Sequence, residues 1–262
     1  MVRVLAAGLR QCGVLAFAFC FATSLIAAQV SREDGQPLSD AERAIAERFH
    51  ATEVVFKADG RVSLLYDFES MDPELLADWS PSLDKMNKTA RWSRDGEGSW
   101  RTVNHGLVIA DKGLLVHAAR WIDVTCEVDC LSVSGSRDGD LLAAVYCYDK
   151  GKQIYGSNFG TQLVRLTGRG APVNAIPKVC PSRCVGDKRF SFGYRYAAGA
   201  LVTQHSKRDV LSSDGHDGFL KKSQPGQAGI CWSGRMQCFV FQVRLEGKLD
   251  EDWLKDASVA KR

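Results

Sequence analysis

The sequence predicts an all-β protein, a sandwich of the jelly-roll kind with one short helix near its start. About a dozen short segments alternate apolar and polar residues with a period of two, which is typical of strands that bury one face. Loops rich in Gly, Asp and Ser separate these segments, and no long stretch has a helical period. Many short strands between turn signals favour a sandwich or barrel over a helical fold.

The first 28 residues have the order of parts of a secretory signal peptide. Arg3 and Arg10 flank the charged start, an apolar run extends to Ala28, and the small pair Ala27-Ala28 offers a cleavage site. We therefore expect an exported, extracytoplasmic protein, either periplasmic or secreted. The alternative is an uncleaved signal that anchors the chain in a membrane, because the run is nearly long enough to span a bilayer.

After the signal, residues 29–51 are expected to form a polar linker with a short helix, and residues 52–257 the β domain. Ser39 and Glu42 have the spacing of a capping box, which predicts a helix that ends at about Phe49. The predicted strands are 52–57, 61–68, 100–103, 106–109, 114–121, 124–133, 141–148, 162–166, 190–196, 201–204, 229–232 and 238–245.

Two of these strands have clear apolar faces. In 61–68, every second residue from Val62 to Phe68 is apolar. In 238–245, the expected apolar face consists of Phe239, Phe241, Val243 and Leu245. A helical turn over 72–79 is expected to end in a packed Trp79, and a closing turn after the last strand is expected to bury Trp253.

The charge of the chain excludes one class of partner. The formal net charge is +3, and it falls by two when Arg3 and Arg10 leave with the signal peptide. Proteins that bind nucleic acid usually present a clustered basic face. A nearly neutral chain with only short basic runs is therefore not expected to bind nucleic acid.

Seven of the nine cysteines follow the expected signal peptide. Cys126 and Cys130 share a strand face with valines, and Cys147 shares one with Ala143 and Val145, so we expect these three as small core residues. A zinc site shared by Cys126 and Cys130 is not expected, because they would lie about 13 Å apart along a strand.

Two disulfide candidates remain among the other cysteines. Cys180 and Cys184 bracket the sequence Pro-Ser-Arg and would close a very short loop. Cys231 and Cys238 flank a possible two-residue hairpin turn at Gly234-Arg235, which would place them opposite one another. An oxidising compartment would permit both bridges.

Aromatic and glycine residues recur at spacings known from one superfamily. They are Tyr66-Asp67-Phe68, Asp78-Trp79, Trp100, Asn104-His105-Gly106-Leu107 and the stretch Val243–Gly247. In this pattern, over roughly 60–255, the chain resembles concanavalin A-like lectins and glucanases, especially laminin-G-like and 3-keto-disaccharide-hydrolase-type domains of secreted bacterial proteins. The resemblance implies a concanavalin A-like antiparallel β-sandwich and a carbohydrate or cell-envelope glycan as partner.

The catalytic candidates are Glu127 and Asp129. Strand alternation places both opposite Cys126 and Val128, and hence away from the core. In the glucanases that the chain resembles, a strand with E-x-D and a further Glu lines the sugar cleft, and hydrolysis needs two carboxylates. Here Leu131 stands where the further Glu is expected. We therefore expect a non-catalytic binding module, with a glycoside or keto-sugar hydrolase and a structural cell-envelope domain as alternatives.

Tyrosines supply the sugar-binding candidates. Tyr146 and Tyr148 lie opposite Cys147 in alternation, and Tyr155 follows shortly after. If Cys147 faces the core, the tyrosines face outward, where aromatic rings can stack on pyranose rings. The alternative is that Tyr146 and Tyr148 fill the core between the sheets. The candidates for binding sugar hydroxyls are Asn158, Glu127 and Asp129.

Two further features have a structural and a functional interpretation. His117 lies on a predicted strand, where a single histidine is more often structural than a catalytic base. Asp138 and Asp140 could offer oxygens to calcium, which laminin-G-like domains sometimes bind, although Arg-Asp-Gly-Asp is more commonly a turn. No cofactor is expected, with calcium as the alternative.

Overall fold

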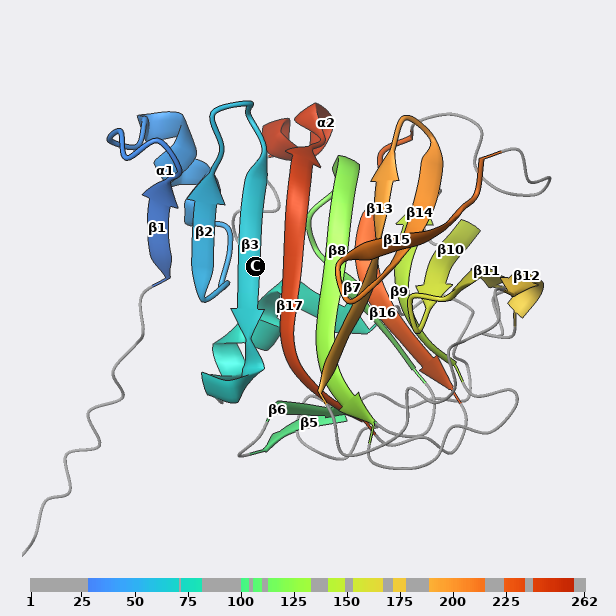
Figure 1. Cartoon of the computed structure of the whole chain (residues 1–262). Helices are drawn as coiled ribbons and strands as arrows, with labels where there is room; N and C mark the ends of the chain where they lie inside the picture. Colours follow the sequence, from blue (N-terminus) through green and yellow to red (C-terminus); the bar gives the residue numbers. More distant parts are fainter. Residues whose placement is uncertain are drawn as a thin grey trace, which may run out of the picture.

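The computed structural model describes residues 28–256 except 71, 82–99, 104–105, 110–112, 133–140, 149–152, 167–171, 178–188, 215–223 and 234–237. The described residues form two β-sheets packed face to face, with short helices at the margins (Figure 1). Almost all strand pairs are antiparallel, so the predicted antiparallel β-sandwich is confirmed. The predicted signal peptide lies outside the described residues apart from Ala28.

The larger of the two sheets, the large sheet, has ten described strands. A pair of strands, β5 (Trp100–Val103) and β6 (Gly106–Ile109), joins it at one end of β17. The other eight lie in the order β1 (Gln29–Arg32), β2 (Glu53–Phe56), β3 (Val62–Asp67), β17 (Cys238–Leu249), β8 (Trp121–Ser132), β13 (Phe190–Ala197), β14 (Ala200–His205) and β15 (Arg208–Ser212).

The small sheet has seven described strands and lies behind the large sheet in Figure 1. Their order is β12 (Pro172–Pro177), β11 (Gln162–Leu166), β10 (Gln153–Asn158), β9 (Leu141–Tyr148), β16 (Gln227–Ser233), β7 (Gly113–His117) and β4 (Trp79–Pro81).

The core lies between the two sheets and contains alternate residues of each strand. From the large sheet come Leu64, Tyr66, Val128, Tyr194 and Leu245, all fully buried. The small sheet contributes residues such as Leu142, Ala144, Tyr146, Ile230 and Trp232. The predicted apolar face from Val62 to Phe68 is confirmed, because its four alternate residues are all buried.

The strand β17 has a β-bulge that the sequence pattern conceals. Val240 lies opposite Cys130 and Gln242 opposite Asp129, so one extra residue, Phe241, is inserted between two paired positions. Buried positions therefore change parity at the bulge, from Cys238 and Val240 before it to Val243 and Leu245 after it. The prediction that Phe239 shares a face with Val243 is wrong for this reason.

Several strands were not predicted. β1 lies in the stretch expected as a linker and pairs in parallel with β2 at the edge of the large sheet. β10, with the sequence QIYGSN, and β15, with RDVLS, lack a clear apolar alternation. β4 and β12 were also missed. The predicted strand 114–121 divides, because β7 ends at His117 and β8 begins at Trp121 in the opposite sheet.

The helices begin and end close to the predicted positions. α1 (Asp40–Ala46) opens with the predicted capping box, in which the Ser39 N–H donates to Glu42 Oε2 at 2.7 Å. η1 (Phe68–Ser70) and η2 (Pro73–Asp78) are 3-10 turns, and α2 (Glu251–Lys255) buries Trp253, as expected. No described helix has the length and apolar character needed to cross a membrane.

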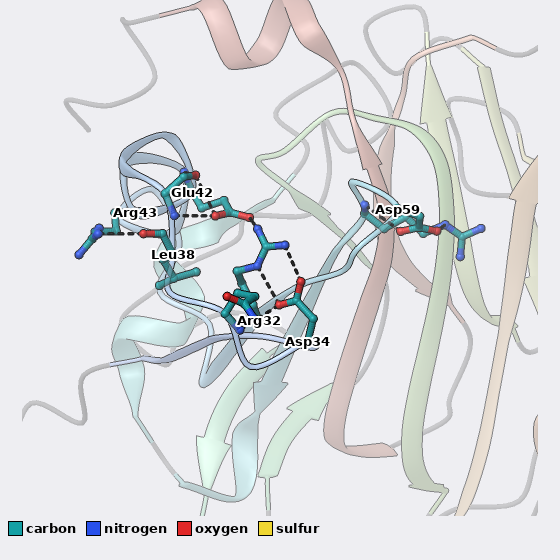
Figure 2. Close-up of polar contacts among 9 residues, drawn as sticks. Arg32, Asp34, Leu38, Glu42, Arg43 and Asp59 are labelled. Atoms are coloured by element: carbon teal, nitrogen blue, oxygen red, sulfur yellow. Dashed lines mark hydrogen bonds and ion pairs between the residues drawn. The ribbon is translucent and has the colours of Figure 1, made fainter.

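Arg32 connects β1 to α1. Its guanidinium donates to Asp34 Oδ1 at 2.9 Å and to Glu42 Oε1 at 2.7 Å (Figure 2). The hydrogen bond from Arg32 lowers the pKa of Asp34 to about 2. Because Glu42 also belongs to the capping box, the strand, the turn and the helix are joined by one set of polar contacts.

Candidate functional site

The outer face of the large sheet, on the side away from the core, carries polar residues in two rows. Glu127 and Asp129 alternate with the buried Cys126, Val128 and Cys130, and so face outward as predicted. Across neighbouring strands, the residues level with Glu127 are Leu65, Arg244, Gly193 and Gln204. Those level with Asp129 are Asp67, Gln242 and Ser191.

A surface hollow lies over these two rows. Its volume is about 500 Å³, and a smaller hollow of about 220 Å³ shares Glu127, Ser191 and Lys207 with it. From here on, the two hollows together are called the hollow. Phe190 and Leu65 add apolar surface. The polar residues that line the hollow are Glu127, Asp129, Arg189, Ser191, Gln204, Ser206, Lys207, Gln242 and Arg244. Five elements that are distant in sequence therefore contribute to one surface.

Gly193 keeps part of the hollow open. It lies level with Glu127 on the neighbouring strand β13 and lines the smaller part of the hollow. A Cβ atom at this position would collide with the carbonyl oxygen of Cys126 and approach Glu127 Cα to 3.0 Å. The close approach of β13 to β8 thus requires glycine, and the missing side chain leaves room beside the Glu127 carboxylate.

Arg189 fixes one side of the hollow. Its Nε donates to Asp129 Oδ2 at 2.7 Å, and its Nη1 lies 3.0 Å from Glu69 Oε2. The guanidinium carbon also lies 4.3 Å from the ring centroid of Phe241, a cation–π distance. The bulge in β17 is what places Phe241 there. Asp129 is therefore held in an ion pair, whereas Glu127 forms none with the described residues.

Glu127, Lys207 and Arg244 are the charged groups of the hollow that have no counter-ion among the described residues. Glu127 and Lys207 make no hydrogen bond or ion pair within the part of the chain that the structure describes. Among the described residues, Arg244 makes one long contact, from Nη1 to Ser63 Oγ at 3.5 Å. These three side chains can therefore bind a ligand without first breaking an ion pair to any described residue.

Lys207 is placed by a tight hairpin between β14 and β15. His205 pairs with Arg208, so Ser206 and Lys207 form a two-residue loop, and their φ angles are 48° and 64°. Two consecutive positive φ angles are typical of a type I′ turn, where Asn-Gly is the usual sequence. The Ser206 N–H donates to the Ser191 carbonyl at 2.8 Å, which holds the loop over the hollow.

The tyrosine candidates lie elsewhere. Tyr146 is fully buried between the sheets, where its hydroxyl donates to the carbonyl oxygens of Trp121 and Gln224. Tyr155 is also buried, and Tyr148 is half-buried and stacks on it at 5.8 Å. Of the two orientations considered for Tyr146 and Tyr148, the structure has the inward one. The reason is that Cys147 faces a second apolar cluster on the opposite side of the small sheet.

Asn158 is likewise a structural residue. Its Oδ1 accepts a hydrogen bond from the Leu142 N–H at 3.0 Å, and its Nδ2 donates to Gln162 Oε1 at 2.9 Å. The side chain is 8% exposed and lies on β10 in the small sheet. It therefore ties β9, β10 and β11 together and does not reach the hollow on the large sheet.

The Cys231–Cys238 disulfide is not formed. The predicted hairpin would place both cysteines in one sheet, but β16 belongs to the small sheet and β17 to the large one. Cys126 and Cys147 are buried, as predicted. Cys180, Cys184, Asp138 and Asp140 lie outside the described residues. Among the described residues, no group of three or more His, Cys, Asp or Glu side chains could hold a metal ion.

His117 belongs to a buried polar cluster between the sheets. Its Nδ1 accepts from the Ala119 N–H at 3.1 Å, so Nε2 carries the proton and lies 2.6 Å from the Tyr66 hydroxyl. Tyr66 in turn donates to Asp78 Oδ2 at 2.6 Å, and His50 Nδ1 lies 2.8 Å from Asp78 Oδ1. Burial lowers the pKa of His117 to about 4. The histidine is a structural residue, as predicted.

Sequence reasoning missed most of the residues that surround Glu127 and Asp129. Gln242 and Arg244 alternate with the apolar residues predicted for the last strand, but nothing in the sequence indicated which strands lie beside it. Arg189 and Lys207 lie in loops with no motif. The ion pairs of Arg189 and the position of Lys207 at the hollow are what single them out.

Comparisons with known proteins give likenesses of fold. No family model matches the chain, and neither does any curated protein sequence. One similar solved structure is a native glycosidic hydrolase, at 11% identity over 70% of this chain and 94% of that one, with a TM-score of 0.49. A β-glucanase of Bacillus licheniformis has 9% identity over 64% and 91%, with a TM-score of 0.47.

A third similar structure is the carbohydrate-binding module CBM66 of Bacillus subtilis. The identity is 14%, the alignment covers 66% of this chain and 93% of that one, and the TM-score is 0.41. Because the TM-scores lie below 0.5, the β-sandwich is established by the strand pairing of the chain itself.

Proposed function

We propose that the outer face of the large sheet binds a carbohydrate, and that the protein is an exported module that holds this ligand without cleaving it. The main support for this proposal is the hollow and the groups that line it. It is open and shallow and offers carboxylate, amide, hydroxyl and guanidinium groups, which suit a ligand covered with hydroxyls. Phe190, half-buried at its side, offers a face on which a sugar ring can pack.

Two observations favour binding over catalysis. Leu131, the next outward residue of β8 after Asp129, occupies the place where a second glutamate would serve as the acid or base. In addition, the Asp129 carboxylate is engaged by Arg189 at 2.7 Å. A carboxylate held in such an ion pair must break that contact before it can act on a substrate.

A glycoside hydrolase is the second candidate, and Glu127 is the observation that favours it. Its carboxylate lines the hollow and has no ion-pair or hydrogen-bond partner in the described part of the chain. Residues two apart on a strand lie about 7 Å from each other, which falls within the range of carboxylate separations in inverting enzymes. The Glu127–Asp129 pair could therefore support hydrolysis if the ion pair with Arg189 opened.

The test uses the chain from Gln29 onward against an array of oligosaccharides, followed by calorimetry on those that bind. Glu127→Gln keeps the shape of the side chain and removes its charge, and it should weaken binding about tenfold. Glu53→Gln is the matched control, because Glu53 lies on the same sheet at β2, outside the hollow. Absence of binding to every saccharide would overturn the proposal.

The same protein separates the two candidates. Chromogenic glycosides and the bound oligosaccharides are incubated with the wild type and with Glu127→Gln. For a binding module, neither protein releases product above the buffer rate. Turnover by the wild type that disappears in Glu127→Gln, with folding unchanged, would establish the hydrolase instead.

A further inference from the structure

Several charged groups that line the larger hollow form no ion pair with a described residue. Three cations and two carboxylates line the larger hollow, namely Arg189, Lys207, Arg244, Glu127 and Asp129. Arg189 is already neutralised by Asp129 and by Glu69, which lies beside the hollow. Lys207, Arg244 and Glu127 remain, two cations against one carboxylate, and none of the three forms an ion pair with another described residue.

The position of Lys207 is maintained at a cost in stability. A lysine with a φ of 64° has the left-handed backbone conformation, which is unfavourable by roughly 1 to 2 kcal/mol for residues with a Cβ. Ser206 before it has the same conformation, and Asn-Gly would satisfy this turn without strain. Strain of this kind is concentrated at functional sites. The turn therefore presents a positive charge where a more stable sequence would present none.

The two cations flank Glu127. Arg244 lies level with Glu127 on the adjacent strand β17, and Lys207 follows β14, two strands away on the other side. At about 4.8 Å per strand, β17 and β14 are roughly 14 Å apart. This backbone separation exceeds the length of a single sugar ring, so there is room for one ring over Glu127 between the strands that carry the two cations.

We propose that the hollow selects an oligosaccharide with acidic groups, carboxylate or sulfate, and that Lys207 and Arg244 bind those groups on either side of Glu127. This inference rests on the proposed function and adds the ligand class. Guanidinium binds such anions through paired hydrogen bonds, and ammonium binds them as a point charge. Glu127 accepts hydrogen bonds from the hydroxyls of the ring between them.

The experiment measures binding by calorimetry for matched charged and neutral ligands. Oligogalacturonides are compared with their fully methyl-esterified forms, and sulfated galactan oligosaccharides with their desulfated forms. The charged member of at least one pair should bind at least tenfold tighter, and its affinity should fall as salt is raised from 50 to 500 mM, values chosen to shorten the Debye length from about 14 to about 4 Å. A preference within the galacturonide pair identifies carboxylate as the acidic group that is bound, and a preference within the galactan pair identifies sulfate.

Single substitutions test whether Lys207 and Arg244 cause the preference for charged ligands. Lys207→Gln and Arg244→Gln should each weaken binding of the charged ligand about five- to tenfold and leave the neutral ligand almost unaffected. Lys248→Gln is the matched control, because it removes one positive charge from the same face of β17, four residues beyond Arg244 and outside the hollow. It should bind as the wild type does.

A stabilised variant shows whether weaker binding of charged ligands could instead result from loss of folding. The double substitution Ser206→Asn with Lys207→Gly supplies the preferred type I′ sequence, so its melting temperature should rise by about 2 to 4 °C. It should nevertheless lose the preference for charged ligands. A more stable protein with weaker binding separates the role of the lysine charge from that of the fold.

The outcomes distinguish this inference from the proposed function. Equal affinity for charged and neutral ligands overturns the inference and leaves carbohydrate binding intact. A preference for charged ligands that persists in both Lys207→Gln and Arg244→Gln also overturns it. Absence of binding to all four ligand types and to the wider array overturns the proposed function itself.

Discussion

Arg189 donates from Nε to Asp129 Oδ2 at 2.7 Å, although the two residues are 60 positions apart in the chain. The contact fixes one carboxylate of the E-x-D strand and leaves the other, Glu127, exposed to ligand. Phe241 supports the arrangement by packing on the guanidinium at 4.3 Å. Arg189, which directly precedes β13, thus contacts β8 through Asp129 and β17 through Phe241.

Replacement of Arg189 tests this arrangement. Arg189→Gln should weaken ligand binding about tenfold, because Asp129 would no longer be held in place. The free energy of unfolding should fall by less than about 1 kcal/mol, since both partners are partly exposed. Arg195→Gln breaks a similar surface pair with Asp209 outside the hollow and should leave binding unchanged. Equal effects of the two variants on affinity would contradict the assigned role.

Gly193 gives the second prediction. Gly193→Ala introduces a Cβ that meets the Cys126 carbonyl oxygen of the neighbouring strand, so it should destabilise the protein by about 1 to 3 kcal/mol. Chemical denaturation measures the loss. Ser191→Ala is the control, because Ser191 is an outward residue of the same strand and needs no backbone movement. A melting curve of Gly193→Ala that coincides with that of the wild type would show that β13 can move away from β8.

His117 gives a prediction on pH. The folded-state pKa is about 4, below the ordinary value of 6.5, because the ring is buried. As the pH falls, the unfolded chain takes up a proton first, so this stability contribution is complete above pH 6.5 and is lost toward pH 4. The loss amounts to about 3 kcal/mol at 1.4 kcal/mol per pKa unit. In His117→Gln, unfolding free energies between pH 6.5 and 4 should decline less steeply than in the wild type.

The cysteines give a chemical prediction. Burial raises the pKa of Cys126 and Cys147, and buried thiols react slowly because the thiolate is the reactive form. In the native protein, Cys126 and Cys147 should resist a thiol reagent, and in denaturant both should react. Peptide mapping without reduction should yield no peptide that links Cys231 to Cys238. Recovery of that peptide would contradict the separation of β16 and β17 into different sheets.

The sequence predicted a helix or strand well where a single residue pair or a single run of alternating residues determines it. Ser39 and Glu42 marked the start of α1, and the alternation from Val62 to Phe68 marked β3 and its buried face. The outward orientation of Glu127 and Asp129 also followed from alternation alone. Such features depend on neighbours within a few residues, which the sequence displays directly.

The predictions were wrong where contacts with strands distant in the sequence determine which face of a strand is buried. The bulge at Phe241 reverses the buried face of β17, and only pairing with β8 reveals it. Cys147 shares a face with Ala143 and Val145, as expected, but that face is the outer side of the small sheet. This placed Tyr146 inside, contrary to the orientation that ligand binding requires. The hollow was missed for the same reason, because Arg189, Lys207 and Arg244 meet only after the strands have assembled.

The central position of β17 has a consequence for how the chain acquires its structure. β3 and β8 are neighbours of β17 and not of each other, so the middle of the large sheet cannot close before the last strand is available. A shortened chain that stops before Cys238 would leave both strands with open edges and would tend to aggregate. Folding of the large sheet is therefore delayed until β17 has been synthesised, whatever the order in which the other strands pair.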